Sequence, residues 1–147
     1  MSVRFHPNNS VDSLESIILK KDGSPLHGEI DIYRKLWTDL KVSDIEWDVW
    51  HDLKLPEHSD NFNYYKKTSA QIDFLILCKY GLLVLEVKGG PISTKNNTFY
   101  YGRDFNTPMK QNPFKQAEGY KYTLKDNTLN NFKNCFFCEA TAFPHVD

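Results

Sequence analysis

The stretch "AQIDFLILCKYGLLVLEVKGG", residues 70–90, decides the fold. It predicts two β-strands, "QIDFLIL" and "LLVLEVK", joined by a short turn at residues 79–81 and ended by "GGP", because Gly and Pro interrupt sheets. The second strand is apolar on both faces, which is typical of a sheet covered on two sides. Charges in such strands are costly, yet this pair contains Asp73, Glu86 and Lys88.

Alternation of side chains places these charges at one end of the hairpin. One face of the second strand carries Leu83, Leu85 and Val87, and the other begins with Leu82 and Val84. That second face continues with Glu86 and Lys88. A turn centred near residue 80 sets Asp73 opposite residues 86–88, and one of the two possible registers brings all three charges together. A slip of one residue would turn Asp73 to the opposite face.

Two carboxylates held close together raise each other's pKa unless a cation lies between them. Their oxygens are natural ligands for Mg²⁺, which can lower the pKa of a bound water and stabilise charge on a phosphate. Lys88 could orient or deprotonate that water, or balance the phosphate charge. The alternative is a structural ion pair in which Lys88 neutralises Glu86.

The remaining elements predict an α/β fold with a central mixed β-sheet flanked by helices. Residues 23–40 predict a helix capped by Ser24, with Pro25 in its first turn and Glu29 at the end of its apolar stripe. The stripe consists of Ile32, Tyr33, Leu36, Trp37 and Leu40. Residues 47–55 predict a strand with Trp47, Val49, His51, Leu53 and Leu55 on one side. Residues 92–102 predict a hairpin turning at Asn96-Asn97, residues 112–125 a helix capped by Asn112, and residues 135–143 a closing strand.

Composition limits the class of protein. The 147 residues, 40% hydrophobic, suffice for one folded domain, and neither a membrane-spanning run nor a signal peptide is evident. Three cysteines do not form a disulfide framework, and a cytoplasmic protein is expected. The net charge of −1 is unevenly distributed: residues 1–87 hold 10 Lys and Arg against 14 Asp and Glu, whereas residues 88–147 hold 8 against 5. A local basic face is therefore one interpretation of the C-terminal part.

An acid in one strand, a short turn and Glu-x-Lys in the next strand resemble the signature of the PD-(D/E)xK nuclease superfamily. More closely, "QIDFLILCKYGLLVLEVKGG" resembles the core hairpin of the nuclease-related domain family. "HGEIDIYRKL" resembles that family's early helix, "NPFKQAEGYKYTL" its later helix, and "ATAFPHVD" its last core strand. The resemblance implies a restriction-endonuclease-like core, with residues 1–22 as an N-terminal extension and residues 23–147 as the nuclease-related domain.

The resemblance also implies roles for individual residues. Asp73, Glu86 and the backbone carbonyl of Val87 would bind Mg²⁺ or Mn²⁺, and Lys88 would be the catalytic lysine. Glu29 would be an upstream acid that points into the site, and Gln116 would contact the metal-bound water or the substrate phosphate. Tyr120, one turn after Gln116, and Lys115 are expected to contact the substrate.

The implied activity is metal-dependent hydrolysis of phosphodiester bonds in DNA, with RNA as an alternative substrate. The resemblance also implies a helicase or another DNA-processing domain beside this module, so we expect the module to be the N-terminal part of a longer protein. Because the chain is nearly neutral, that domain would supply much of the nucleic-acid grip. DNA processing and anti-phage defence are the expected settings, and no membrane partner is expected. The rival hypothesis is an inactive nuclease-fold module that binds nucleic acid or a partner protein.

Other motifs favour simpler interpretations. Cys135 and Cys138 form a C-x₂-C motif, but a zinc site needs four ligands and the chain offers only Cys78 and a histidine such as His145 besides. His51 could act as a general base, although a hydrogen-bonded structural histidine is commoner, and His27 could support the site from its rim. The aromatic group Phe99, Tyr100, Tyr101 and Phe105 could stack on bases, although half of it is expected to face a core. Lys66 and Lys67 could touch phosphates from a polar loop.

Overall fold

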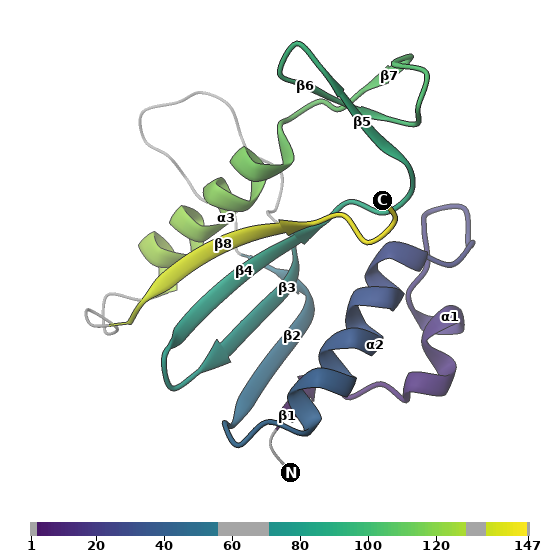
Figure 1. The fold of residues 1–147 in the computed structure, drawn as a ribbon. Helices are drawn as coiled ribbons and strands as arrows, with labels where there is room; N and C mark the ends of the chain where they lie inside the picture. Colours follow the sequence, from purple (N-terminus) through teal and green to yellow (C-terminus); the bar gives the residue numbers. More distant parts are fainter. Residues whose placement is uncertain (1–2, 56–70, 129–134, 147) are drawn as a thin grey trace.

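The computed structural model describes residues 3–55, 71–128 and 135–146, and its centre is a mixed sheet of five strands (Figure 1). In spatial order these strands are β1 (Val3–His6), β2 (Trp47–Lys54), β3 (Gln71–Cys78), β4 (Gly81–Val87) and β8 (Phe137–Ala142). β1 runs parallel to β2 and β8 parallel to β4, whereas β2, β3 and β4 are antiparallel. The predicted mixed sheet is confirmed.

Two long helices flank the sheet, α2 (His27–Lys41) and α3 (Pro113–Thr128) (Figure 1). Tyr33 of α2 belongs to one hydrophobic core, together with Phe74 of β3, while Leu124 of α3 belongs to a second core with Val84 of β4. The short helices η1 (Val11–Ser13) and α1 (Leu14–Ile17) precede α2. None of the helices in the described ranges combines the length and hydrophobicity that crossing a membrane requires. The α/β class with helices around a central sheet is therefore confirmed.

The β3–β4 hairpin has one of the predicted registers. Its ladder runs from Cys78 opposite Gly81 to Phe74 opposite Leu85, which leaves a turn at residues 79–80. The apolar faces of β4 divide as expected: Leu83, Leu85 and Val87 contact the α2-side core, and Leu82 and Val84 contact the α3-side core. Continuing the register past the last ladder pair sets Asp73 opposite Glu86, so the charges gather where the hairpin ladder ends.

The first long helix begins later than predicted. Ser24 does not cap it, because the backbone N–H and hydroxyl of Ser24 both donate to Oδ1 of Asp22, at 2.9 and 2.6 Å. This local turn competes with helix formation, and Pro25 forms an isolated antiparallel bridge with Leu19. The helix therefore starts at His27, and the predicted apolar stripe packs on the α2-side core, joined by Ile30.

The prediction that the apolar residues of β2 all lie on one side of the strand is correct only up to His51. Val49 packs in the α2-side core, whereas Leu53 and Leu55 pack in the α3-side core, so the single-sided alternation over residues 47–55 is wrong. The reason is Asp52, whose φ of 57° is left-handed and interrupts the regular alternation of side chains. The loop that follows, including Lys66 and Lys67, lies outside the described residues.

A small three-stranded sheet, β5 (Ile92–Lys95), β6 (Thr98–Tyr101) and β7 (Thr107–Pro108), lies between β4 and α3 in the chain. Asn96 and Asn97 form its predicted first turn, both with positive φ, as a two-residue hairpin requires. Asn112 caps α3 as predicted, because its Oδ1 accepts the backbone N–H of Phe114 at 2.9 Å. Phe99 anchors β6 by packing on Phe114 and Phe143.

Two glycines set how closely the start of α2 approaches the end of β4. A Cβ atom on Gly28 would lie 2.7 Å from the Cα of Gly89, and a Cβ on Gly89 would lie 3.0 Å from the Cα of Gly28. Both contacts are with backbone, which cannot rotate away as a flexible side chain can. This approach holds Glu29, the next residue of α2, beside the charged end of the hairpin.

Gly28→Ala should destabilise the fold by about 1–3 kcal/mol, because the added methyl group overpacks a backbone contact. Gly119→Ala is the matched control: nothing lies within 4 Å of its Cβ position, and Ala is the better helix former by about 0.5–1 kcal/mol. Urea unfolding of both variants measures the two effects, which should have opposite signs. Equal shifts in the same direction would contradict the close approach.

Candidate active site

The end of the β3–β4 hairpin brings Asp73, Glu86 and Lys88 together. Oδ2 of Asp73 accepts the backbone N–H of Val87 at 2.7 Å, so a side chain continues the pairing where the backbone ladder stops. Nζ of Lys88 donates to Oε1 of Glu86 at 2.6 Å. The three charged side chains therefore lie close together, in the register that was predicted to bring them to one face.

Burial opposes the ionisation of the acids in this cluster. Glu86 is only 2% exposed, and burial raises its pKa, while the neighbouring ammonium of Lys88 acts in the opposite direction. Burial, and then the charges of Glu86 and Glu29, raise the pKa of Asp73 to about 8. Burial is the largest single influence on the pKa of Lys88 and lowers it, but the hydrogen bond to Glu86 and the neighbouring negative charges together raise the pKa above its ordinary value. Lys88 is therefore an ammonium ion at neutral pH, whereas burial and the neighbouring acids keep Asp73 largely protonated there unless a further cation lies beside it.

Glu29 reaches the same centre from α2. Its carboxylate charge raises the pKa of both Asp73 and Glu86, so it faces the two hairpin acids. Oε2 of Glu29 lies 2.7 Å from Nε2 of His51 on β2, and both side chains are largely buried. The ring of His51 lies against Phe74, 4.9 Å between centroids. His51 is thus the hydrogen-bonded histidine that the sequence favoured over a free general base, and its bond fixes the Glu29 carboxylate.

Three residues of helix α3 were predicted to take part in the site, and two of them, Gln116 and Tyr120, lie toward it. Nε2 of Gln116 donates to the hydroxyl of Tyr120 at 2.9 Å. Burial raises the pKa of Tyr120, and the charges of Glu86 and Asp73 raise it further, which places its hydroxyl near them. Lys115 is not brought in: its side chain is 71% exposed and pairs with Glu118 at 2.8 Å. It lies beside a different hollow, bounded by α3 and β8.

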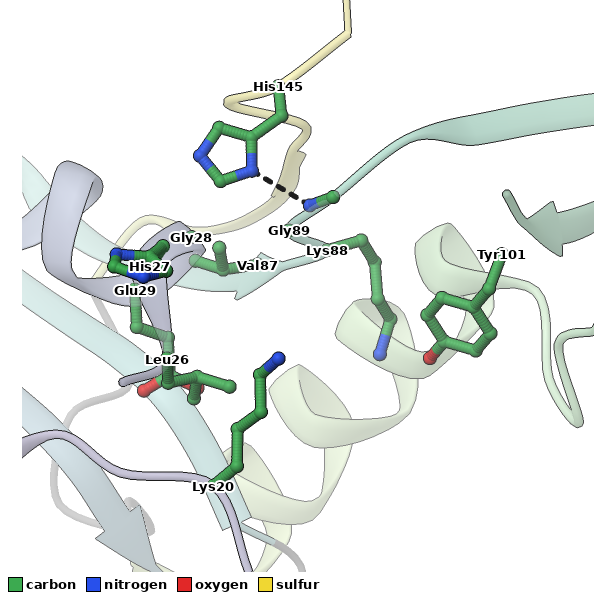
Figure 2. Close-up of a pocket in the computed structure, with 11 residues that line it drawn as sticks. Lys20, Leu26, His27, Gly28, Glu29, Val87, Lys88, Gly89, Tyr101 and His145 are labelled. Atoms are coloured by element: carbon green, nitrogen blue, oxygen red, sulfur yellow. Dashed lines mark hydrogen bonds between the residues drawn. The ribbon is translucent and has the colours of Figure 1, made fainter. Parts of the chain in front are cut away.

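A cleft of about 420 Å³ opens at this end of the hairpin (Figure 2). Its walls include Glu29 from α2, Lys88 after β4 and Tyr101 from β6. His145 closes one side: its Nδ1 accepts the backbone N–H of Gly90 at 2.8 Å, and its Nε2 donates to Asp31 at 2.8 Å. The cleft is thus bounded by the start of α2, the end of β4 and the C-terminal segment, and of the three acids Glu29 lines it.

Sequence reasoning missed Lys20 as a wall of this cleft and weighed Tyr101 and His145 only for other roles, whereas His27 lines the cleft, in agreement with one of the alternatives weighed for it. Tyr101 was singled out for its aromatic neighbours, His27 for the rim of the site, and His145 for zinc. Lys20 carries no such signal, because its place in the cleft depends on a turn that packs against the start of α2.

The family of the chain follows from a comparison with known proteins. A family model described as "Nuclease-related domain" matches residues 24–144. The chain belongs to the nuclease-related domain family. This match includes every candidate site residue named above except Lys20 and His145. No curated protein and no solved structure matches the chain.

The donor set in this nuclease-related domain fits a hard divalent cation. Oε2 of Glu86 is buried and has no hydrogen-bond partner, and the carboxyl groups of Asp73 and Glu29 act on the same region. Within the described ranges, no three His, Cys, Asp or Glu side chains are arranged as a ready-made metal cluster. A bound ion would therefore need backbone, water or phosphate oxygens as well, which is the coordination that Mg²⁺ prefers.

In the described part of the chain, the cysteines belong to no group of three or more His, Cys, Asp or Glu side chains that could hold a metal ion. Cys78, Cys135 and Cys138 are free thiols. Sγ of Cys138 lies 3.5 Å from the carbonyl oxygen of Leu82, and burial raises its pKa, which keeps it protonated. Cys138 is therefore a packed thiol of β8.

In the presence of a chelator, the free energy of unfolding should fall as the pH rises. The folded-state pKa of Asp73, about 8, lies above the ordinary value of about 4, so the unfolded chain loses this proton first and is favoured by rising pH between those values. In Asp73→Asn, the part of this decrease in the free energy of unfolding that comes from Asp73 should be absent. Denaturant unfolding at about pH 5 and about pH 8 measures it, and an identical pH dependence in both proteins would contradict the burial of an acid at Asp73.

Proposed function

We propose that this domain is a divalent-metal-dependent nuclease that hydrolyses phosphodiester bonds in DNA. The observation that carries the proposal is the convergence of three acids, Asp73, Glu86 and Glu29, with the ammonium of Lys88 beside one open cleft. A structural ion pair needs one acid for one base, and additional buried acids would only weaken it. Clustered acids whose ionisation is opposed by burial and by each other instead suit a bound cation, which would favour their ionised forms and attract an incoming phosphate.

Each residue has a role in this proposal. Asp73 and Glu86 would hold Mg²⁺ or Mn²⁺, together with the backbone carbonyl of Val87. The ion would supply Lewis acidity, lowering the pKa of a bound water and offsetting charge on the phosphate. Of the roles that the sequence left open for Lys88, its raised pKa favours charge balance over proton abstraction, because an ammonium ion cannot accept a proton.

Residues around this centre would orient the reacting groups. Glu29 faces the acids and is held by His51, so it can accept a hydrogen bond from a water molecule in the cleft. Gln116 and Tyr120 are hydrogen-bonded to each other on the α3 side, where they can contact the substrate phosphate or a metal-bound water. Lys115 faces elsewhere, and its assignment to the substrate has no support from its position.

The low net charge of the chain bears on how the domain would hold nucleic acid. The chain carries a formal net charge of −1, which is weak for a protein that must hold a polyanion alone. We therefore propose that a helicase or another DNA-processing domain, in the same chain or complex, adds nucleic-acid affinity. RNA as the substrate, and DNA processing or anti-phage defence as the process, stay predictions.

Cleavage of plasmid DNA and of a matched RNA, with Mg²⁺ or Mn²⁺, tests the proposal. Glu86→Gln and Lys88→Met should each lower the cleavage rate by at least about 10²-fold, because each removes a charge that the reaction needs while keeping side-chain size. Glu46→Gln changes an exposed acid in the segment that follows the C-terminal end of α2; it is the control and should retain the rate.

Full activity of Glu86→Gln would contradict the assigned roles. Binding of nucleic acid without cleavage by the unaltered protein would favour the inactive binding module instead. Failure to bind Mn²⁺, together with a large loss of stability in Lys88→Met, would favour a structural ion pair.

A further inference from the structure

The segment before the family match takes part in the fold and in the cleft. The match begins at residue 24, but β1 (Val3–His6) is a strand of the central sheet, parallel to β2. Farther along this segment, Lys20 lines the same cleft as Glu29 and Lys88. A residue outside the family's module therefore borders the candidate active site.

A short hydrogen-bonded turn fixes the backbone of Lys20. Its N–H donates to the carbonyl of Ser24 at 2.8 Å, and its carbonyl accepts from Gly23 at 3.0 Å. Asp22 stabilises the turn through its two bonds from Ser24. The N–H of Leu26 then donates to the carbonyl of Ile18 at 2.9 Å, which ties the turn to the start of α2. Because the backbone is held at several points, less entropy is lost when the side chain engages a ligand.

The side chain of Lys20 extends into the cleft from the wall opposite Lys88 (Figure 2). Lys88 is bonded to Glu86, whereas the ion pairs among the described residues do not include Lys20. Asp22, its nearest acid in sequence, is bonded to Ser24. Two ammonium groups that face one cavity repel each other until an anion lies between them.

We propose that Lys20 binds a phosphate of the substrate strand adjacent to the phosphate that is cleaved. This inference rests on the proposed nuclease function and assigns the cleft to a polynucleotide strand. A cleft of about 420 Å³ lies within the range of sites that enclose a whole small ligand, larger than one phosphate group needs. Tyr101 adds an aromatic wall on which a sugar or base can lie.

Binding of a fluorescent single-stranded DNA oligonucleotide, measured by anisotropy in the presence of a chelator, tests the proposal without catalysis. Lys20→Ala should weaken binding by about fivefold to tenfold at low salt, and the slope of log affinity against log salt should fall by about 0.7, as expected for one lost phosphate contact on a single strand. Lys20→Arg should keep most of the affinity. Lys21→Ala is the matched control, a neighbour that is also exposed but does not line the cleft, and it should change affinity less than twofold.

Kinetics on two substrates separates phosphate binding from a structural effect. Lys20→Ala should raise KM for an oligonucleotide but leave hydrolysis of bis(p-nitrophenyl) phosphate, which has one phosphodiester and no neighbouring phosphate, unchanged. Equal loss on both substrates, or no difference between Lys20→Ala and Lys21→Ala in binding, would overturn the proposal while the nuclease function stands. An unaltered protein that neither binds nor cuts an oligonucleotide would overturn both.

Discussion

The hydrogen bond from the backbone N–H of Val87 to the carboxylate of Asp73 is the contact on which the site depends. It forms where the β3–β4 ladder ends, so the side chain of an acid takes the position of a backbone acceptor. This contact keeps Asp73 on the face that carries Glu86 and Lys88, and it holds an acid in a place where burial raises its pKa to about 8. Burial and the neighbouring acids oppose ionisation of both carboxyl groups beside one ammonium, and a further cation would favour their ionised forms.

The rest of the fold brings further groups to that cluster. The contact between Gly28 and Gly89 lets α2 approach the end of β4, and His51 holds the carboxylate of Glu29 toward the hairpin. From the opposite side of the sheet, α3 contributes Gln116 and Tyr120. The free energy cost of burying charge is offset by hydrophobic packing of both helices on the sheet, which involves residues away from the site.

The hairpin and its charges could be predicted because their signals are local. A short turn and a period of two residues fix the register, and the register decides which face each charge occupies. The start of α2 could not be predicted as well, since the Asp22–Ser24 turn competes with the cap that Ser24 could otherwise form. Lys115 differs from Gln116 for a geometric reason: consecutive residues on a helix point about 100° apart, so both cannot face one site. The place of Lys20 depends on contacts between separate segments, which no local pattern encodes.

We propose that this hairpin holds a divalent cation between its acids. Anomalous scattering from a crystal grown with Mn²⁺ tests this proposal. We expect one strong peak within coordination distance of the carboxylates of both Asp73 and Glu86, and its loss in Asp73→Asn. A crystal of a protein that cleaves DNA with Mn²⁺ present, but with no anomalous peak at these two residues, would contradict the account.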